Sequence, residues 1–522
     1  MKHTLTTLLF FVFLSFNLAA QENNFFSVKV VDSISNTPIS FATIRIAKTT
    51  RGLIADEEGN FRLPQDIQTQ NDSLIISAIG FKTKFVNLKF FENAILNIIN
   101  IAPKVEVLQT VTITKNIAKG KGPRILTANQ IVKNAVQNIK INYAVDPFSY
   151  LAYYRDYQVF QNQYFNLNEG LIEVFDAGFK TDLFLNKENK TALYSYALNT
   201  NFNQSERFSM PYDNKSSKYI ENANIIAMGG NELSILQLHD PIRNHEIKNL
   251  AFIYNLETDF INNHDFELLG TTFLNDKPIY EIGITKKFKI NTSLSKMKNR
   301  KFQERFKVHG SIYISKGNFE IHKIQYAVYE GESKNSKYAI NLEYTPKNNV
   351  MYLNYLSFNN AFKVLDETGF RTTAVYLKDS VDVVHVDFNN PVNKSTLKKK
   401  NFKLYYTNIL LPIKSIELVG SKSIKIHLKA NTFKKYAIID GAQITLYPKN
   451  VLDTANKVLN KSLFFDVNQF REVFVQEVFS NKQPDSNLEY INKSQPLSYS
   501  RLNKMDNNLK YWLNTPLKKT KE

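Results

Sequence analysis

The run of short strands and tight turns between residues 28 and 83 constrains the fold of this chain more than any other stretch. Val28 and Val30 alternate around a lysine, at the period of a half-buried strand. Asp56-Glu57-Glu58-Gly59 is typical of a turn, because glycine takes positive φ without a steric penalty. Gly80 ends a continuous apolar run, as at the end of a core strand. These features predict a small β-sandwich.

The same residues carry a resemblance to a known family. Its motifs are Pro38-Ile39-Ser40-Phe41-Ala42-Thr43, Gly52-x-x-x-Asp56-x-x-Gly59-x-Phe61 and Ile76-Ser77-x-x-Gly80-Phe81. In this order they resemble the carboxypeptidase regulatory-like domain, a transthyretin-like β-sandwich, over residues 21–115. The resemblance implies a module of Gram-negative envelope proteins that accompanies catalytic domains in some carboxypeptidases. It implies no catalytic residue within the module, since a fold does not transfer chemistry.

The first twenty residues have the pattern of a secretory signal. Lys2 and His3 precede an apolar core at residues 8–14, and Leu18-Ala19-Ala20 provides small residues at a cleavage site. We therefore predict a signal peptide at residues 1–20 and export to the periplasm or the periphery of the outer membrane. No later stretch approaches the roughly 20 apolar residues of a transmembrane helix. The chain has no cysteine, so disulfides cannot hold an exported fold together.

The net charge of +18 bears on the choice of partner. An exported basic protein could bind an envelope protein, a glycan or an anionic lipid, and the lysine-rich segment 284–308 is the candidate contact for anionic headgroups or glycans. The basic residues are dispersed and no nucleic-acid-binding motif is present, so we predict no nucleic-acid partner.

Residues 116–379 have the pattern of a central antiparallel β domain with one helix. Thr127 and Gln130 form a capping box before an apolar helical stripe that ends at Asp146-Pro147. Long aromatic strands follow, and a hairpin is predicted with its turn at Asn275-Asp276-Lys277. The run of strands is similar to the half-open barrels of periplasmic lipoprotein carriers. That similarity implies a lipid-binding alternative, whereas a filled core is the other interpretation.

Residues 380–461 resemble a bacterial Ig-like domain. The segment opens with Val386-Asp387-Phe388-Asn389-Asn390-Pro391-Val392 and closes near Asp453-Thr454-Ala455-Asn456, without the glycine usual in the closing motif. Strands spaced about ten residues apart also predict a sandwich. Residues 462–522 return to an aromatic run and a polar tail, which makes the Ig-like sandwich an insertion in the central domain. The fold class is thus mainly β.

One catalytic hypothesis deserves a test. Zinc carboxypeptidases take two ligands from His-x-x-Glu and a third from a distant histidine, and His264, Glu267 and His385 match that pattern. A spacing of three residues places ligands together on a helix, however, whereas Glu267 leads directly into a strand pattern. We therefore predict no catalytic, cofactor or metal site, and an exported, non-catalytic envelope protein with a binding or scaffolding role.

Overall fold

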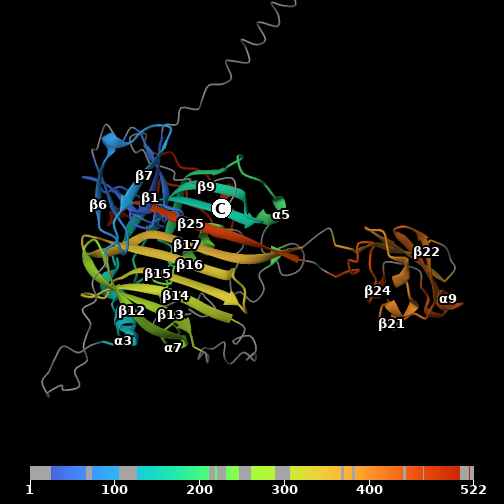
Figure 1. The fold of residues 1–522 in the computed structure, drawn as a ribbon. Coiled ribbons are helices and arrows are strands. Elements are labelled where there is room, and N and C mark those ends of the chain that lie inside the picture. The colour runs from blue at the N-terminus through green and yellow to red at the C-terminus, as the bar shows by residue number, and fades with distance from the viewer. Residues whose placement is uncertain are drawn as a thin grey trace, which may run out of the picture. The chain divides into compact units, whose positions relative to one another are not determined.

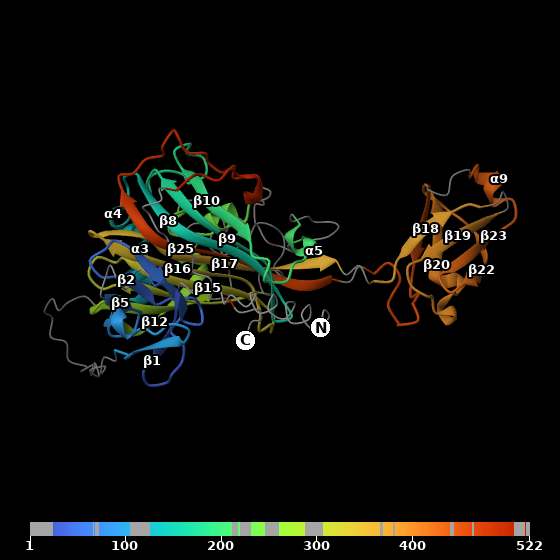
Figure 2. The same ribbon diagram turned by 90° about the horizontal axis from the view of Figure 1, so that it is seen from above.

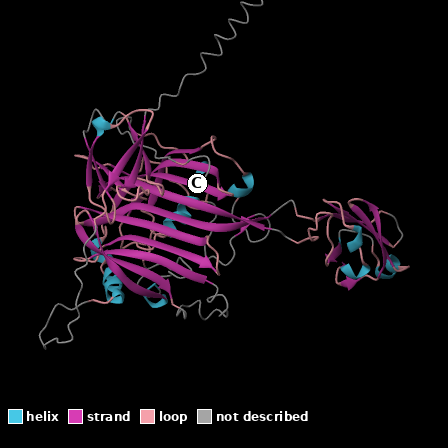
Figure 3. Ribbon diagram, viewed as in Figure 1, coloured by secondary structure: helices cyan, strands magenta, loops and turns pink. Residues whose placement is uncertain are grey.

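The computed structural model describes residues 25–65, 67, 73–104, 126–210, 218–219, 231–245, 260–287, 306–365, 369–378, 382–438, 443–461, 464–505 and 517. Strands dominate these residues, as the magenta arrows of Figure 3 show, and the mainly β class is confirmed. The predicted signal peptide and most of the basic segment 284–308 lie outside the described residues. Among the described helices, none combines the length and apolarity needed to cross a membrane.

The N-terminal segment is a sandwich of two small sheets. One sheet has the order β4 (Asn60–Pro64), β1 (Phe25–Asp32), β7 (Leu96–Ile101), and the other has the order β3 (Gly52–Ile54), β2 (Thr43–Ile46), β5 (Ser73–Ser77), β6 (Lys84–Asn87), followed by η1 (Leu88–Phe90). Alternate residues such as Val28 and Val30 are fully buried between the sheets. Gly59 has a φ of +74°, and a Cβ there would lie 2.6 Å from the carbonyl oxygen of Val30, so the turn requires glycine.

The centre of the protein is one 11-stranded sheet (Figures 1 and 2). In sheet order its strands are β10 (Lys190–Leu198), β9 (Gln163–Asp176), β8 (Phe148–Phe160), β25 (Phe464–Ser480), β17 (Val350–Leu365), β16 (Ser336–Lys347), β15 (Ile321–Glu330), β14 (Phe306–Ser315), β13 (Lys277–Lys286) and β12 (His264–Leu274), and β11 (Lys218–Tyr219) pairs with the end of β17. Antiparallel pairs join β12 through β17, and β25 through β9. Asn275 and Asp276 take φ values of 47° and 63° in the β12–β13 hairpin, where the sequence predicts the turn.

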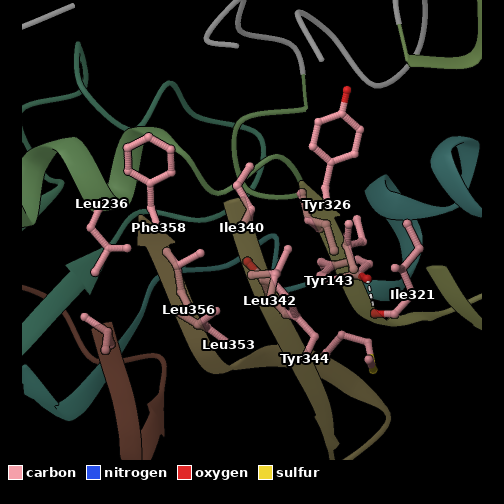
Figure 4. Packing of buried hydrophobic residues seen from close by; sticks show 14 of the residues in the cluster. Tyr143, Leu236, Ile321, Tyr326, Ile340, Leu342, Tyr344, Leu353, Leu356 and Phe358 are labelled. Carbon is pink, nitrogen blue, oxygen red and sulfur yellow. Dashed lines mark hydrogen bonds between the residues drawn. The ribbon is translucent and has the colours of Figure 1, made fainter. Parts of the chain in front are cut away.

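Helices cover one face of this sheet, here called the inner face. They are α3 (Ala128–Gln137), α4 (Ile139–Asn142), α6 (Glu232–Leu238) and α7 (Ile261–Asn263), while α5 (Glu206–Ser209) lies beside β9. Figure 4 shows Ile340, Leu342 and Tyr344 of β16 on this face, with Phe358 of β17 between them and Leu236 of α6. The Tyr143 hydroxyl donates to the carbonyl oxygen of Ile321 at 2.8 Å, so the chain just after α4 is fixed to β15.

The capping box predicted before α3 is confirmed. The Thr127 hydroxyl accepts from the Gln130 backbone N–H, and the Gln130 side chain accepts from the Thr127 N–H. The prediction of one helix for the central domain is wrong, because α6 also forms. Asn231 caps α6, and six of its seven residues are buried. A helix this short and buried on every side has no polar face, so its sequence lacks the periodicity that identifies an amphipathic helix.

A second compact unit comprises residues 213–219 and 363–466. Its sheets have the orders β18 (Thr372–Tyr376), β19 (Val383–Phe388), β23 (Ser423–Leu428), β22 (Ile413–Gly420), and β21 (Ile409–Leu410), β20 (Phe402–Tyr406), β24 (Ile444–Pro448). Short helices α9 (Thr432–Tyr436), η4 (Lys394–Thr396) and η5 (Lys399–Asn401) complete it, and η7 (Leu497–Tyr499) lies in the first unit. Its two sheets enclose a separate apolar core that includes Val384, Val386 and Ile426.

Two details of this unit differ from the sequence-based expectation. The strand at residues 374–377 was expected in the central domain, but β18 pairs with β19, so the unit begins earlier than residue 380. The closing turn lacks glycine, and Asn456 takes the positive φ of 64° in its place. Asparagine tolerates this conformation better than other non-glycine residues. The Asp453 carboxylate accepts from the N–H groups of Ala455 and Lys457 and fixes the turn.

The chain leaves the large sheet after β17 and re-enters it at β25, which is the neighbour of β17. The ends of the second unit therefore connect to adjacent strands. We expect residues 366–463 to fold alone, with a sheet-type circular dichroism spectrum and one cooperative thermal transition, because their core is self-contained. A short Gly-Ser bridge in their place should leave the large sheet folded, since closing a short loop costs only a few kcal/mol. A disordered fragment together with an aggregating remainder would contradict both expectations.

Candidate binding site

The sandwich contacts the face of the large sheet opposite the helices, here called the outer face. The Phe41 ring stacks on the Tyr355 ring, with centroids 4.5 Å apart and planes 28° apart. Ile54 joins them in a small apolar cluster with Tyr153 and Phe474 of the sheet. Phe41 has a positive φ of 59°, which for an aromatic residue costs on the order of 1 kcal/mol or more. The contact between the two domains thus includes a strained residue.

Polar groups extend this contact to the middle and the edge of the sheet. The Asn354 amide donates to the Thr43 hydroxyl at 3.0 Å, and the Arg51 guanidinium lies 3.5 Å from the Glu477 carboxylate. At the far edge, the Gly80 N–H donates to the carbonyl oxygen of Phe273 at 2.8 Å. The sandwich is therefore anchored at separate points, and the space between the anchors forms a groove.

The larger part of the groove is a cleft of about 570 Å³, here called the large cleft. Thr43, Arg45 and Arg51 line it from the sandwich, and Thr345 and Lys347 line it from the sheet. This volume lies within the range of about 300–1,000 Å³ that is typical of ligand pockets.

Lys323, Glu343 and His322 line the large cleft and belong to two hydrogen-bonded pairs. Lys323 donates to Glu343 at 2.8 Å, and both side chains are mostly buried. His322 Nε2 lies 2.6 Å from the Ser315 hydroxyl, and burial lowers the pKa of His322 to about 4. Glu320 approaches the same Nε2 at 3.7 Å rather than Nδ1. A catalytic triad needs the carboxylate on the nitrogen remote from the serine, so this arrangement does not form one.

The smaller part of the groove is a cleft of about 270 Å³, here called the small cleft. The turn residues Glu57 and Glu58 line it from the sandwich. From the sheet it is lined mainly by tyrosines, amides and one ion pair: Tyr157, Tyr164, Tyr329, Tyr355, Asn341, Asn359, Asn468, Arg155 and Glu472. Phe41 lines both clefts, so the Phe41–Tyr355 contact separates them.

The buried ion pair of Arg155 and Glu472 lines the small cleft. Arg155 Nε donates to Glu472 Oε2 at 2.6 Å, and the hydroxyls of Tyr157 and Tyr355 donate to the same carboxylate at 3.2 and 2.7 Å. Burial alone would lower the pKa of Arg155, but the adjacent Glu472 carboxylate raises it above its usual value. Arg155 is 1% exposed and its Nη1 has no hydrogen-bond partner. An unsatisfied buried donor of this kind is costly and calls for an explanation.

The charges of Arg155 and Glu472 also act on the Asp56 carboxyl of the sandwich. Its Oδ1 accepts from the N–H groups of Glu58 and Asn60, whereas its buried Oδ2 has no partner. Burial raises the pKa of Asp56 to about 7, and Arg155 opposes this rise. The carboxyl is therefore stabilised in its protonated form near neutral pH.

A second pair of buried charges lies on the inner face. Asp156 and Arg471 sit directly opposite each other on β8 and β25. Arg471 Nη1 donates to Asn360 at 2.7 Å, and its Nε contacts Glu232 of α6. Burial, followed by the repulsion of Glu232, raises the pKa of Asp156 to about 7. Arg471 ties α6 to the sheet through Glu232, and neither Arg471 nor Asp156 lines a cleft of the groove.

The structure does not bring the proposed zinc ligands together. His264 begins β12 and is fully buried, whereas Glu267 lies three residues further along the same strand and is exposed, since odd spacing directs side chains to opposite faces. His385 belongs to β19 in the other unit. Among the described residues, no three His, Cys, Asp or Glu side chains form a group that could hold a metal ion.

His264 has structural partners instead. Its Nδ1 lies 2.8 Å from the carbonyl oxygen of Phe260, and its Nε2 lies 2.8 Å from the Tyr326 hydroxyl. Burial lowers the pKa of His264 to about 4, so the ring is neutral. Both nitrogens are occupied, and the side chain holds β12 against β15.

The lipid-binding alternative would place acyl chains on the inner face. The described side chains of that face already contact helices: Ile131, Val132 and Val136 of α3 lie in one apolar cluster with Leu342 and Phe358 of the sheet. The groove on the outer face is consequently the better-defined candidate site.

The groove residues were not identified from the sequence. Charged residues inside two aromatic strands, Arg155-Asp156 in β8 and Arg471-Glu472 in β25, were the available signal. Two adjacent opposite charges in each of two buried strands predict that the strands pair and neutralise one another.

Comparisons with known proteins identify the first domain. Residues 27–113 match the CarboxypepD_reg-like domain, so this part of the chain is a domain of that kind, as its motifs predict. No curated protein matches the chain at a significant level. A LolA superfamily protein from Nitrosomonas europaea, known from its crystal structure, is 10% identical with a TM-score of 0.20, and the match covers 45% of this chain and 86% of that one. A TM-score this low does not establish a shared fold.

Glu472→Gln should destabilise the large sheet by about 3 kcal/mol, because it leaves the buried Arg155 charge uncompensated while preserving the side-chain shape. Urea denaturation monitored by circular dichroism measures the change. Glu267→Gln, at an exposed position of β12, is the matched control and should change stability by less than about 0.5 kcal/mol. Equal stability of the two variants would show that the ion pair is not essential to the sheet.

Asp56→Asn should alter how stability depends on pH. A carboxyl whose pKa is raised on folding binds its proton more tightly in the folded state, so stability falls as pH rises from 3.8 to about 7. The asparagine keeps the Oδ1 acceptor of the turn and cannot ionise. The melting temperature of the variant relative to wild type should therefore increase across this window. A difference that is constant with pH would mean that Asp56 does not titrate abnormally.

Proposed function

We propose that this protein is an exported, non-catalytic binding protein of the cell envelope. Its ligand lies in the groove between the CarboxypepD_reg-like domain and the outer face of the large sheet. The observation that carries the proposal is the groove itself: two domains joined at the Phe41–Tyr355 stack leave clefts of about 570 and 270 Å³ on either side of it. Clefts between domains are common ligand sites, because both walls can supply polar groups.

The chemistry of the groove favours binding over catalysis. Its strongly charged groups are held by each other, as Lys323 is by Glu343 and Arg155 by Glu472. The pKa of His322 is lowered, and Glu320 approaches the same ring nitrogen as Ser315, so these three residues do not form a catalytic triad. Groups fixed in this way can orient a ligand by hydrogen bonds, and Asp56, whose pKa is raised to about 7, does not line either cleft.

The envelope location rests on the signal-peptide pattern of residues 1–20. The CarboxypepD_reg-like domain, which recurs in envelope proteins, supports the same location.

A bulky residue in the large cleft should abolish envelope binding. Thr345→Trp places an indole in the cleft, and Thr285→Trp places the same side chain on the outer face away from both clefts. We expect the mature wild-type chain and Thr285→Trp to sediment with Gram-negative sacculi or outer-membrane vesicles, and Thr345→Trp to stay in the supernatant with an unchanged melting temperature. Equal sedimentation of the two variants, or no sedimentation of the wild type with either particle, would refute the proposal.

A further inference from the structure

The small cleft contains a buried donor and a buried acceptor that no protein group satisfies. Arg155 Nη1 is the donor, and Asn341 Oδ1 is the acceptor. Asn341 is on the outer face, since its neighbours Ile340 and Leu342 lie on the inner face (Figure 4). A hydroxyl group both accepts and donates hydrogen bonds. A ligand that carries several hydroxyls can therefore supply the missing partners of Arg155 and Asn341.

Charge determines which ligands the cleft admits. Glu57, Glu58 and Glu472 line it, against Arg155 and Lys334. The excess of carboxylates disfavours a phosphate or a carboxylate ligand, and the unsatisfied Arg155 donor disfavours a cation. A neutral polar ligand fits this balance.

Aromatic rings and amides supply the remaining surface. The Tyr157 ring stacks on the Phe470 ring at 5.2 Å and meets the Tyr164 ring edge-on at 5.3 Å. Side-chain amides of Asn335, Asn359 and Asn468 also line the cleft. Each amide can both donate to and accept from a hydroxyl, and aromatic rings contact the apolar face of a sugar.

The small cleft offers a peptide fewer main-chain hydrogen bonds than a free sheet edge would. Extended peptides usually add to the free edge of a sheet through main-chain hydrogen bonds. The small cleft lies over β8, β25, β17 and β16, which are interior strands with a neighbour on each side. These four strands therefore offer no free edge to a peptide within this cleft.

We propose that the small cleft is a binding subsite for a neutral saccharide, with Arg155 donating to one hydroxyl and Asn341 accepting from another. The volume of about 270 Å³ lies just below the usual range for drug-sized ligands, which suits one or two sugar rings. This inference rests on the proposed function and names the ligand class of the same groove.

Saturation-transfer difference NMR on the mature full-length chain tests the proposal with four probes: N,N′-diacetylchitobiose, maltose, inorganic phosphate and a blocked alanine dipeptide. At least one disaccharide should bind, and Asn341→Leu should weaken it about tenfold, because the ligand hydroxyl loses its acceptor. Gln325→Leu is the matched control, since Gln325 lies directly opposite Asn341 on β15 and does not line the cleft. This control should bind the sugar as the wild type does, and both variants should keep the wild-type melting temperature.

The outcomes separate this inference from the function on which it rests. Binding of phosphate or dipeptide alone, or equal sugar affinity of Asn341→Leu and wild type, would overturn the saccharide subsite. If the chain still sediments with envelope particles in that case, the binding function stands with another ligand class. If the wild type neither sediments nor binds any probe, both proposals fail.

Discussion

The buried ion pair of Arg155 and Glu472 fixes the register of β25 against β8. Arg155 lies opposite Glu472 on the outer face, and Asp156 lies opposite Arg471 on the inner face. A shift of β25 by one residue would move every side chain to the other face and place Arg155 opposite another arginine or a valine. Leaving a buried charge unpaired costs several kcal/mol, so only this pairing register of β8 and β25 is favourable at these residues. The position of β25 between β8 and β17 depends on this ion pair.

The same residues of β8 and β25 connect both faces of the sheet to other elements. On the outer face the Glu472 carboxylate accepts from Tyr355, whose ring stacks under Phe41 of the sandwich. On the inner face Arg471 holds Glu232 at the start of α6. One line of residues across β8 and β25 thus positions both the docked domain and the helix, and it places the unsatisfied Arg155 donor in the small cleft.

Sequence reasoning succeeded where the determining contacts are local. The turn at Gly59, the capping box of Thr127 and the hairpin at Asn275 each depend on residues a few positions apart. The site could not be assembled in this way, because Arg155 and Glu472 are 317 residues apart and acquire their roles only when β8 and β25 pair. The helix α6 was missed for a related reason, since its burial comes from elements distant in the chain.

The late position of β25 in the chain affects how the sheet can form during synthesis. Strands β8 to β10 and β12 to β17 precede residues 366–463, and within the sheet β25 (residues 464–480) lies between the two groups. Until that segment emerges, β8 and β17 expose open edges rich in tyrosine and phenylalanine, the kind of surface that pairs with other chains. The second unit lengthens this interval by about a hundred residues. The last long strand of the chain is therefore the one that closes both open edges and completes the sheet.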